Sequence, residues 1–363
     1  MNDAENRPDW ALILAPMAIF LIGLFFIYSA SRREGQMMDE SLVFRQALWM
    51  MFSVAVVFFS TRFHYRWLLG AAWPMYAVVM ILLVAVFFTP ARLGAHRWIR
   101  IGFASLQPSE IAKIAVIVIL AAVMREKQFG AYSQKRFLIP LALMAAPMVL
   151  ILKEPDLGTS LLLVPVFMTM AVVAGMKKRW IVIFVLVAGL LSPILYSHLK
   201  NYQKQRILTF VNPGRDPLGA GYTIIQSRIA IGSGGLVGKG FLEGSQTQLR
   251  FLPERHTDFI FSVIGEEGGF AAAGAVIFLY WLIVHRGYRI ARRSSNRFGK
   301  LLATGFTTLL ATQTIVNISM TMGLLPVVGM PLFGVSYGGS SLLVGMFLIG
   351  LLVNIGMRRD PFL

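Results

Sequence analysis

One acidic residue stands where a long polar segment meets a hydrophobic run. Asp258 lies within FLPERHTDFIFSVIGEEGGF (residues 251–270), directly before the apolar run that begins at Phe259. A carboxylate at a membrane–water boundary can contact a water-soluble reacting group and a lipid-linked one. Desolvation there raises the pKa of a carboxyl group toward the working pH, as a general base requires. The position therefore favours catalysis on a lipid-linked substrate, with Asp258 as the candidate base.

A competing interpretation is helix capping. Asp258 or Thr257 can satisfy the free amides at the N-terminus of the following helix, which would lower the pKa of Asp258 and make it a poor base. The residues alone leave these two interpretations open. His256 is a second candidate base, although we expect it to position or hydrogen-bond a partner. Glu266 and Glu267, two turns further on, must face a cavity or partner groups and not lipid.

A second chemical candidate is the pair Glu110 and Lys113 in QPSEIAK. The two residues are three apart, so they share one face of a helix. Each charge costs roughly 2.5–3.5 kcal/mol at mid-membrane on insertion scales, and mutual pairing offsets part of that cost. The pair can be a structural ion pair, or Lys113 can contact the negative charge of a lipid phosphate.

Two further segments carry weaker signals. Glu154 and Asp156 in LKEPDLGTS can bind Mg²⁺ or Mn²⁺ through oxygen ligands, with Asp156 the candidate ligand, or form a simple Asp turn. The glycine cluster GSGGLVGKG is not a nucleotide-binding P-loop. A P-loop requires Gly at its first position and Ser or Thr after its Lys, whereas here Ser233 stands at that first position and Gly240 follows Lys239. Its amides and Lys239 can contact an anion such as pyrophosphate, or the cluster can be a flexible turn.

The elements that must position these residues are membrane helices. The chain has 363 residues, 56% of them hydrophobic, with 14% charged and a mean hydropathy of +0.68. About ten apolar runs are long enough to cross a bilayer. They lie near Trp10–Ser29, Val43–Ser60, Leu68–Phe88, Ile111–Val123, Phe137–Leu152, Gly158–Gly175, Trp180–His198, Phe259–Val284, Leu302–Met322 and Gly338–Gly356. The sequence predicts an all-α polytopic membrane protein with about ten transmembrane helices.

We expect residues 1–363 to form a single integral membrane domain with one long loop, residues 199–258, between helices seven and eight. Structureless loops of this length are uncommon and usually functional. Within it, NPGRDPLGAGY is rich in turn residues, whereas YTIIQSRIAIG has the spacing of a short interfacial or re-entrant helix. We also expect the segment Arg92–Gln107 to lie at the membrane interface.

The net charge of +17 follows membrane orientation and does not indicate nucleic acid. Lys and Arg concentrate in alternate connections, which the positive-inside rule places in the cytoplasm together with both termini. Against that trend, further arginines fall on predicted outer segments, where an anionic substrate would explain them. They are Arg45, Arg97, Arg100, Arg206, Arg215, Arg228, Arg250 and Arg255. The chain contains no cysteine, which excludes disulfide and thiol chemistry.

Five ordered motifs resemble one family. The segments RWIRIGFASLQPSEIAK, EPDLGTSLLL, GYTIIQSRIAIGSGGLVGKG, LPERHTDFIFSVIGEE and GLLPVVGMPLFGVSYGGSSLL are similar to the SEDS proteins of shape, elongation, division and sporulation. Two of them, LPERHTDFIF and GSGGLVGKGFLEGSQTQL, resemble the RodA-like elongation branch more than the division branch.

The resemblance implies a peptidoglycan glycosyltransferase that polymerises lipid II at the outer face of the bacterial cytoplasmic (inner) membrane. It implies a class B penicillin-binding protein as partner and no organic cofactor. Asp258 matches the family's essential loop acid, and Glu110 and Lys113 match its intramembrane pair. Other motif positions, with substrate binding as the expected role, are Arg45, Arg97, Asp156, Gln226, Lys239, Gln248 and the SYGGSS segment around Ser336.

Two other functions stay open at this stage. A many-span protein with intramembrane Glu and Lys can be a lipid II flippase, although we find no paired broken helices in matching halves. A non-catalytic scaffold for the penicillin-binding protein would need neither an acid at the membrane boundary nor an excess of outer arginines. The favoured mechanism is an inverting displacement in which Asp258 deprotonates the acceptor hydroxyl and undecaprenyl pyrophosphate leaves.

Overall fold

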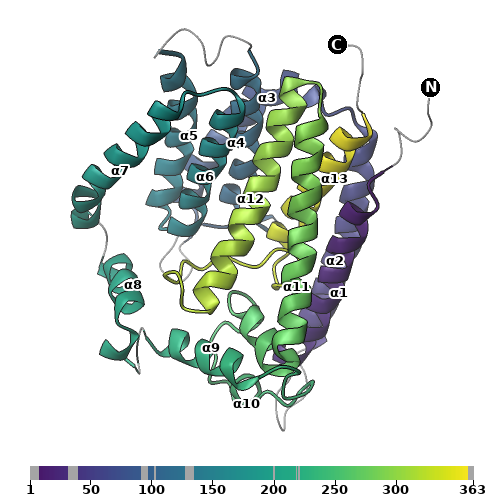
Figure 1. The fold of residues 1–363 in the computed structure, drawn as a ribbon, viewed down its shortest axis with the longest axis vertical. Coiled ribbons are helices and arrows are strands. Elements are labelled where there is room, and N and C mark those ends of the chain that lie inside the picture. Colours follow the sequence, from purple (N-terminus) through teal and green to yellow (C-terminus); the bar gives the residue numbers. More distant parts are fainter. Residues whose placement is uncertain are drawn as a thin grey trace.

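The structure is a helical bundle (Figure 1). The computed structural model describes residues 8–31, 40–90, 97–101, 104–126, 135–198, 201–217, 219 and 221–358. Each predicted apolar run coincides with a helix. These helices are α1 (Ala11–Ser31), α2 (Glu40–Arg62), α3 (Trp67–Ala85, extended by the 3₁₀ turn η1, Val86–Phe88), α4 (Pro108–Met124), α5 (Lys135–Lys153), α6 (Leu157–Val173), α7 (Lys178–His198), α11 (Ile260–Arg293), α12 (Arg297–Thr321) and α13 (Gly339–Met357).

Six of these helices are long and apolar enough to cross a membrane. They are α1, α2, α3 with η1, α11, α12 and α13, and the described parts of α5 and α6 form shorter apolar helices. The chain is thus a multi-pass membrane protein, as the composition predicts. The full count of ten transmembrane helices stays a prediction.

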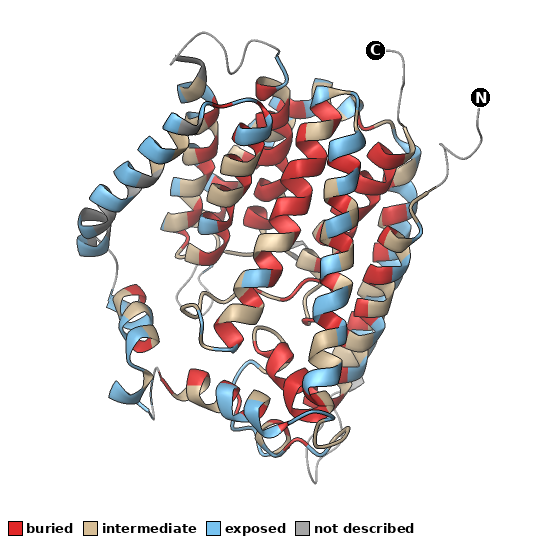
Figure 2. Cartoon of the chain, viewed as in Figure 1, coloured by how far each residue is buried: buried red, intermediate tan, exposed pale blue. Residues whose placement is uncertain are grey.

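The core is built around α4 and α12. Figure 2 shows both helices mostly buried, whereas α7 and α8 stand at the periphery of the bundle. On α4, the run from Ala115 to Ala121 is fully buried, as expected for a helix that is apolar on every side. Helix α4 packs on α3, α5, α6 and α12, and α12 packs also on α11. In a bilayer, such contacts stabilise the bundle through close packing and polar contacts between helices.

The segment after η1 contains a small sheet that the sequence did not predict. Strands β1 (Ile99–Ile101) and β2 (Ala104–Leu106) form a two-stranded antiparallel sheet, with Ile99 opposite Leu106. Every other element of the described chain is helical, in line with the all-α prediction. The alternation of apolar residues there is the period-two pattern of a strand. Part of the expected interfacial segment, residues 92–96 and 102–103, lies outside the described residues.

The described part of the long loop contains four helical segments. It contains α8 (Asn201–Val211), the 3₁₀ turn η2 (Pro213–Arg215), α9 (Tyr222–Ser233) and the short α10 (Ser245–Gln248). The predicted helix in YTIIQSRIAIG is confirmed as α9. Residues 199–200, 218 and 220 of the predicted loop lie outside the described residues. The position of the loop on the outer side of the membrane stays a prediction.

Helix α11 is interrupted at Gly269, where φ is 62°. The amides freed by the break, those of Phe270 and Ala271, donate to the carbonyls of Gly235 and Leu236 at 2.9 and 3.0 Å. In return, the Lys239 amide donates to the Glu266 carbonyl at 3.0 Å. The glycine cluster therefore pairs with a broken helix through its backbone, and glycine allows this close approach because it has no side chain.

Candidate active site

A cavity of about 790 Å³ brings six of the predicted site residues together. It is bounded by the N-terminal parts of α2, α4, α6 and α13, the turn before α11, and residues 329–331. The predicted residues that line it are Arg45, Arg97, Glu110, Lys113, Asp156 and Asp258. Because a helix N-terminus carries partial positive charge, the convergence of several N-termini favours an anionic ligand in this cavity.

Asp258 lies in the turn that precedes α11 and is partly buried. Its carboxylate accepts no hydrogen bond from the residues that the structure describes, and the N-cap of α11 is Phe259, which has no side-chain cap. The alternative in which Asp258 caps this helix is therefore wrong. Desolvation, and then the nearby Glu254 carboxylate, raise the pKa of Asp258 to about 6, while Arg206 and Arg97 act in the opposite direction. A carboxyl group with this pKa is suited to accept a proton near neutral pH.

The backbone at Asp258 is held by a buried amide on α12. The Asn317 side chain donates from Nδ2 to the carbonyl oxygen of Asp258 at 3.0 Å and to that of Met330 at 2.6 Å. Asn317 is fully buried. One turn earlier, Gln313 donates to the Pro331 carbonyl at 2.9 Å. Helix α12 thereby fixes two walls of the cavity relative to each other.

The residues beside Asp258 are held by the segment before α13. The Ser336 hydroxyl donates to the Thr257 carbonyl at 2.6 Å and accepts from the Leu332 amide at 2.7 Å. The Tyr337 amide donates to the His256 carbonyl at 2.8 Å. Ser336 and His256 thus support the cavity wall and do not line the cavity, whereas Tyr337 does.

Open space next to the Asp258 carboxylate depends on Gly329. This residue has φ of +69°, a conformation that side chains rarely adopt, and a Cβ placed there would lie 3.4 Å from Oδ2 of Asp258. Glycine at this position therefore allows the turn and leaves one side of the carboxylate open to the cavity.

Glu110 and Lys113 form the ion pair that their spacing predicts. Lys113 Nζ lies 2.7 Å from Glu110 Oε1, and both side chains are buried. The other carboxylate oxygen of Glu110 has no partner among the described residues. Both residues line the cavity, so the pair presents hydrogen-bonding capacity to whatever binds there.

Asp156 acts as a helix cap. Its Oδ1 accepts from the Thr159 amide at 3.2 Å, which makes it the N-cap of α6. Its Oδ2 accepts from Gln107 at 3.1 Å and from Ser109 at 3.4 Å. This local cap is close to the simple Asp turn that was one of the two alternatives, and both oxygens are already engaged by donors.

Arg97 and Glu154 lie beside Asp156 at the turn between α5 and α6. Arg97 donates through Nε to the Glu154 carbonyl at 3.1 Å and through its guanidinium to the Pro155 carbonyl. The Glu154 side chain is fully buried, and neither of its carboxylate oxygens has a partner among the described residues. Burial, and then Asp156, raise the pKa of Glu154 to about 8, against the effect of Arg97.

These side chains do not fit a resident metal ion. Within the described ranges, no group of three or more His, Cys, Asp or Glu residues is placed to hold one. The oxygens of Asp156, the predicted ligand, accept from neutral donors, and a Glu154 carboxyl with a raised pKa is a poor cation ligand near pH 7.

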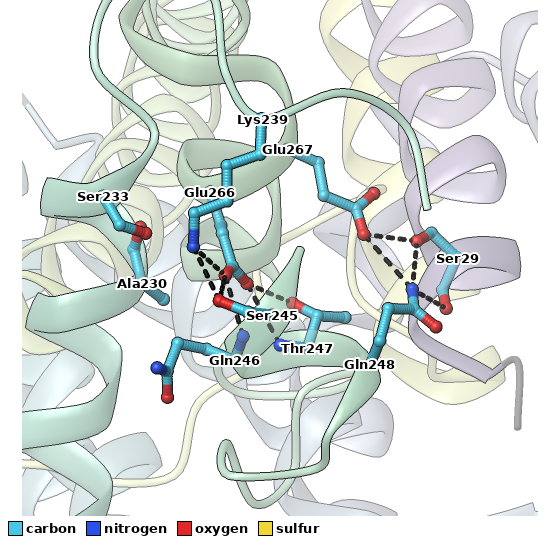
Figure 3. A network of polar contacts seen from close by, with 10 residues as sticks. All are labelled: Ser29, Ala230, Ser233, Lys239, Ser245, Gln246, Thr247, Gln248, Glu266 and Glu267. Atoms are coloured by element: carbon cyan, nitrogen blue, oxygen red, sulfur yellow. Dashed lines mark hydrogen bonds and ion pairs between the residues drawn. The ribbon is translucent and has the colours of Figure 1, made fainter. Parts of the chain in front are cut away.

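Lys239 and Gln248 belong to a separate polar network around Glu266 and Glu267 (Figure 3). Lys239 Nζ lies 2.8 Å from Glu266 Oε1. Gln248 donates to the Ser29 hydroxyl at 3.2 Å and to Glu267 at 3.4 Å. The expectation that Glu266 and Glu267 face a cavity or partner groups and not lipid is confirmed.

Three of the predicted substrate ligands are not among the residues that line the cavity. These are Lys239 and Gln248, which belong to the network just described, and Gln226, which is on α9. Their roles in substrate binding stay predictions, and their placement gives those roles no support.

Asn317 and Gln313 were not predicted from the sequence as site residues, nor were the cavity-lining aromatic residues Trp49, Phe52 and Tyr337. A carboxamide inside a predicted membrane helix is a signal that would have found Asn317, because such a group must be satisfied within the protein. The aromatic residues carry no signal of this kind, since aromatic residues occur throughout the apolar runs.

Known proteins resemble this chain over nearly its whole length. Residues 9–360 match the family of FtsW, RodA and SpoVE, described as cell cycle proteins. The peptidoglycan glycosyltransferase MrdB of Escherichia coli strain K12 is 41% identical over 353 residues, which cover 97% of this chain and 94% of that protein. Among solved structures, one described as a peptidoglycan synthase complex that coordinates polymerisation and crosslinking matches with a TM-score of 0.84 and 30% identity, covering 98% of this chain and 99% of that one. RodA of Thermus thermophilus matches with a TM-score of 0.73 and 26% identity, covering 97% of each chain.

Proposed function

The chain belongs to the FtsW/RodA/SpoVE family, and from this premise we propose that it is a peptidoglycan glycosyltransferase that polymerises lipid II into β-1,4-linked glycan strands during cell elongation. The relatives named peptidoglycan glycosyltransferase support the activity. The similarity to MrdB and to RodA supports the elongation branch. The bacterial inner membrane is the corresponding location.

The observation that carries the mechanism is the state of Asp258. It is a carboxylate that accepts no hydrogen bond from the described residues, has a raised pKa, and lines a cavity that also contains Lys113, Arg45 and Arg97. An acid that was purely structural would be expected to be satisfied by donors, because a buried unpaired polar group is costly. The cations nearby are suited to a substrate that carries phosphate.

The proposed reaction is a single inverting displacement. Asp258 accepts the proton of the 4-hydroxyl of GlcNAc on the acceptor lipid II. The hydroxyl oxygen forms a bond to the anomeric carbon of MurNAc on the growing donor, and the bond from that carbon to the pyrophosphate oxygen breaks. Undecaprenyl pyrophosphate leaves with the electron pair, and the α-linked donor becomes a β-1,4 linkage.

The cavity residues stabilise the charge that develops on the leaving group. Lys113, Arg45 and Arg97 provide positive charge, and the helix N-termini at Pro108 and Gly339 add oriented backbone dipoles. Such preorganised groups act strongly because they need no rearrangement during the reaction. A divalent cation, Mg²⁺ or Mn²⁺, enters this scheme as part of the pyrophosphate substrate and not as a resident ion on Asp156.

The proposal includes an orientation and a partner. The cavity faces the outer side of the membrane with both termini in the cytoplasm, in line with the basic connections. The partner is a class B penicillin-binding protein that crosslinks the strands. The similarity to a synthase complex that couples polymerisation to crosslinking supports this partner.

The test is polymerisation of labelled lipid II by the purified protein with its penicillin-binding partner, whose transpeptidase site is blocked by a β-lactam. Wild type and Asp258→Asn are compared with and without a chelator, followed by added Mg²⁺ or Mn²⁺. Product from wild type alone supports the mechanism. Equal product from both proteins would place the base elsewhere.

The two rival functions separate in proteoliposomes. Movement of lipid II across the bilayer without glycan product would indicate a flippase. Neither movement nor product, with the partner still bound, would indicate a scaffold.

A further inference from the structure

A strongly basic groove lies on the C-terminal part of α11, away from the cavity that contains Asp258. Its volume is about 460 Å³, and it is lined by His285, Tyr288, Arg289, Arg292 and Arg293. We call these five residues the basic groove. All of them come from one helix, and the proposed glycosyltransferase mechanism uses none of them.

The arginines of the basic groove have no acidic partner in the described part of the chain. The ion pairs found there join Lys113 to Glu110, Lys239 to Glu266 and Arg286 to Asp9. Arg286, on the same helix, differs from them because its guanidinium lies 3.5 Å from the carboxylate of Asp9, which balances its charge. The groove therefore carries a net positive charge that no acid of the described chain balances.

An aromatic stripe continues the basic groove along α11. The ring of Trp281 stacks on His285 at a centroid distance of 5.1 Å and on Phe278 at 5.7 Å. Trp281 and Phe278 are 54% and 57% exposed. At 100° per residue, Phe278, Trp281 and the five residues of the basic groove fall within an arc of roughly 140° around the helix axis. One outward face of α11 thus passes from apolar rings to arginines.

The length of α11 places this transition near a membrane interface. The part of α11 after the break at Gly269, Phe270 to Arg293, has 24 residues, and at 1.5 Å per residue it is about 36 Å long, whereas the hydrocarbon core of a bilayer is about 30 Å thick. The excess length, together with the charges of Arg292 and Arg293 in the last turn, places the C-terminal end of α11 in the headgroup region. Trp is suited to that boundary, because its ring is largely apolar and its N–H is polar.

One wall of the basic groove is fixed by α12. The hydroxyl of Tyr288 lies 2.9 Å from that of Thr308, and Thr308 lies 3.0 Å from Thr169 on α6. Tyr288 is partly buried, whereas His285, Arg289, Arg292 and Arg293 are exposed. An anchored wall beside several exposed cations is a surface that can hold an anion in one orientation.

We propose that the basic groove binds the headgroup of an anionic phospholipid, with its acyl chains lying along Phe278 and Trp281. Arginine binds phosphate through two parallel hydrogen bonds, and basic pockets at the membrane face of transmembrane helices are suited to anionic headgroups. The continuity with an exposed apolar stripe favours a lipid over a soluble anion or an acidic protein segment. Three arginines favour a lipid with two phosphates, such as cardiolipin, over one with a single phosphate.

The experiment is native mass spectrometry of the full-length protein in a neutral detergent, titrated with cardiolipin, phosphatidylglycerol or phosphatidylcholine. The variant Arg289→Gln/Arg292→Gln/Arg293→Gln should bind cardiolipin about tenfold or more weakly than wild type. The matched control, Arg62→Gln/Arg125→Gln/Arg179→Gln, removes the same charge from other basic connections and should bind as wild type does. Equal weakening in both variants would mean diffuse attraction, and no weakening in either would overturn the site.

Two further arms keep the test decisive if the glutamine variant folds poorly. Replacing the same three arginines by lysine keeps the charge but removes bidentate contacts, and should reduce the preference for cardiolipin over phosphatidylglycerol. An unchanged preference would contradict the phosphate contacts. Inorganic pyrophosphate should displace cardiolipin only far above the concentration at which the lipid binds. Displacement at equal concentration would assign the site to a soluble anion. None of these outcomes depends on glycosyltransferase activity.

Discussion

Asp258 and Glu266 lie eight residues apart in the sequence, yet their surroundings are opposite. Asp258 precedes α11, and Glu266 lies in the second turn of that helix. The Glu266 carboxylate is fully buried and accepts from the amides of Gln246 and Thr247 at 2.8 and 3.0 Å, and from Lys239 at 2.8 Å. The Asp258 carboxylate is partly exposed to a cavity and accepts no hydrogen bond from the described chain.

The difference separates structural acids from reactive ones. A carboxylate whose oxygens already accept from several protein donors is held in place and is not free to take a substrate proton. A desolvated carboxylate without donors has a raised affinity for a proton. Glu266 thus joins the glycine cluster and α10 to α11, as Figure 3 shows, while Asp258 stays available for chemistry.

The largest expected effect is on activity at Asp258. Asp258→Asn keeps the size of the side chain but removes its basicity, and should lower lipid II polymerisation by about 10²–10⁴-fold. The folded state should not be weakened. Its thermal unfolding at pH 7.5 should occur at a temperature equal to or above that of wild type.

The stability of this variant should depend on pH in a defined direction. The folded pKa of Asp258, about 6, is above its unfolded value of about 3.9. A raised folded pKa contributes stability below pH 4 that is lost as the pH rises through 6. Asp258→Asn, which cannot ionise, should therefore exceed wild type above pH 6 by at most about 2–3 kcal/mol, and the two should converge near pH 4. A constant difference would contradict the raised pKa.

Glu266→Gln should show the reverse pattern. The amide group places a donor where the carboxylate accepted backbone N–H groups, and it leaves Lys239 without its charge partner. We expect a loss of about 2–4 kcal/mol of stability, measured by thermal unfolding in detergent. Glu243→Gln makes the same change at an exposed position of the loop that Glu266 contacts and should be neutral. Equal stability of the two variants would show that the network is dispensable.

A smaller effect should follow at Asn317, which holds the backbone of Asp258. Asn317→Leu leaves the carbonyls of Asp258 and Met330 without their donor and should lower kcat by about 10–100-fold, with KM little changed, because a small misplacement of a catalytic group is costly. Asn354 is a matched control. It is a buried amide near the C-terminus of α13 that donates to the carbonyls of Ser60 and Phe63. Asn354→Leu should destabilise the protein without the selective loss of kcat.

The smallest effect concerns the pH profile of the wild-type enzyme. Because Asp258 must be deprotonated to act as a base, activity should rise about tenfold per pH unit below 6 and level off above 7. Initial rates of polymerisation between pH 5 and 8 measure this. Asn317→Leu should keep the midpoint while lowering the plateau, whereas a flat profile would remove Asp258 from the role of base.

Much of the fold could be predicted because helix formation follows local patterns. The apolar runs gave the positions of α1 to α7 and α11 to α13, and α9 followed from the spacing in residues 222–232. The pair Glu110 and Lys113 was equally local, since residues three apart in a helix must meet. The small sheet was missed because strands of three residues, such as Ile99–Ile101, carry too short a pattern to recognise.

The sequence by itself determined the class of protein, its helices and the boundary position of Asp258, because hydrophobicity and helical spacing act over neighbouring residues. Only the tertiary structure decided which distant polar groups meet. It placed Lys239 against Glu266, brought Gln107 and Ser109 to Asp156, and brought Asn317 to the backbone of Asp258. Such pairings join residues up to tens of positions apart, and no local period encodes them. Packing therefore decides whether the oxygens of a given carboxylate accept hydrogen bonds from the protein or stay available to a substrate, because only the folded chain determines which donors reach them.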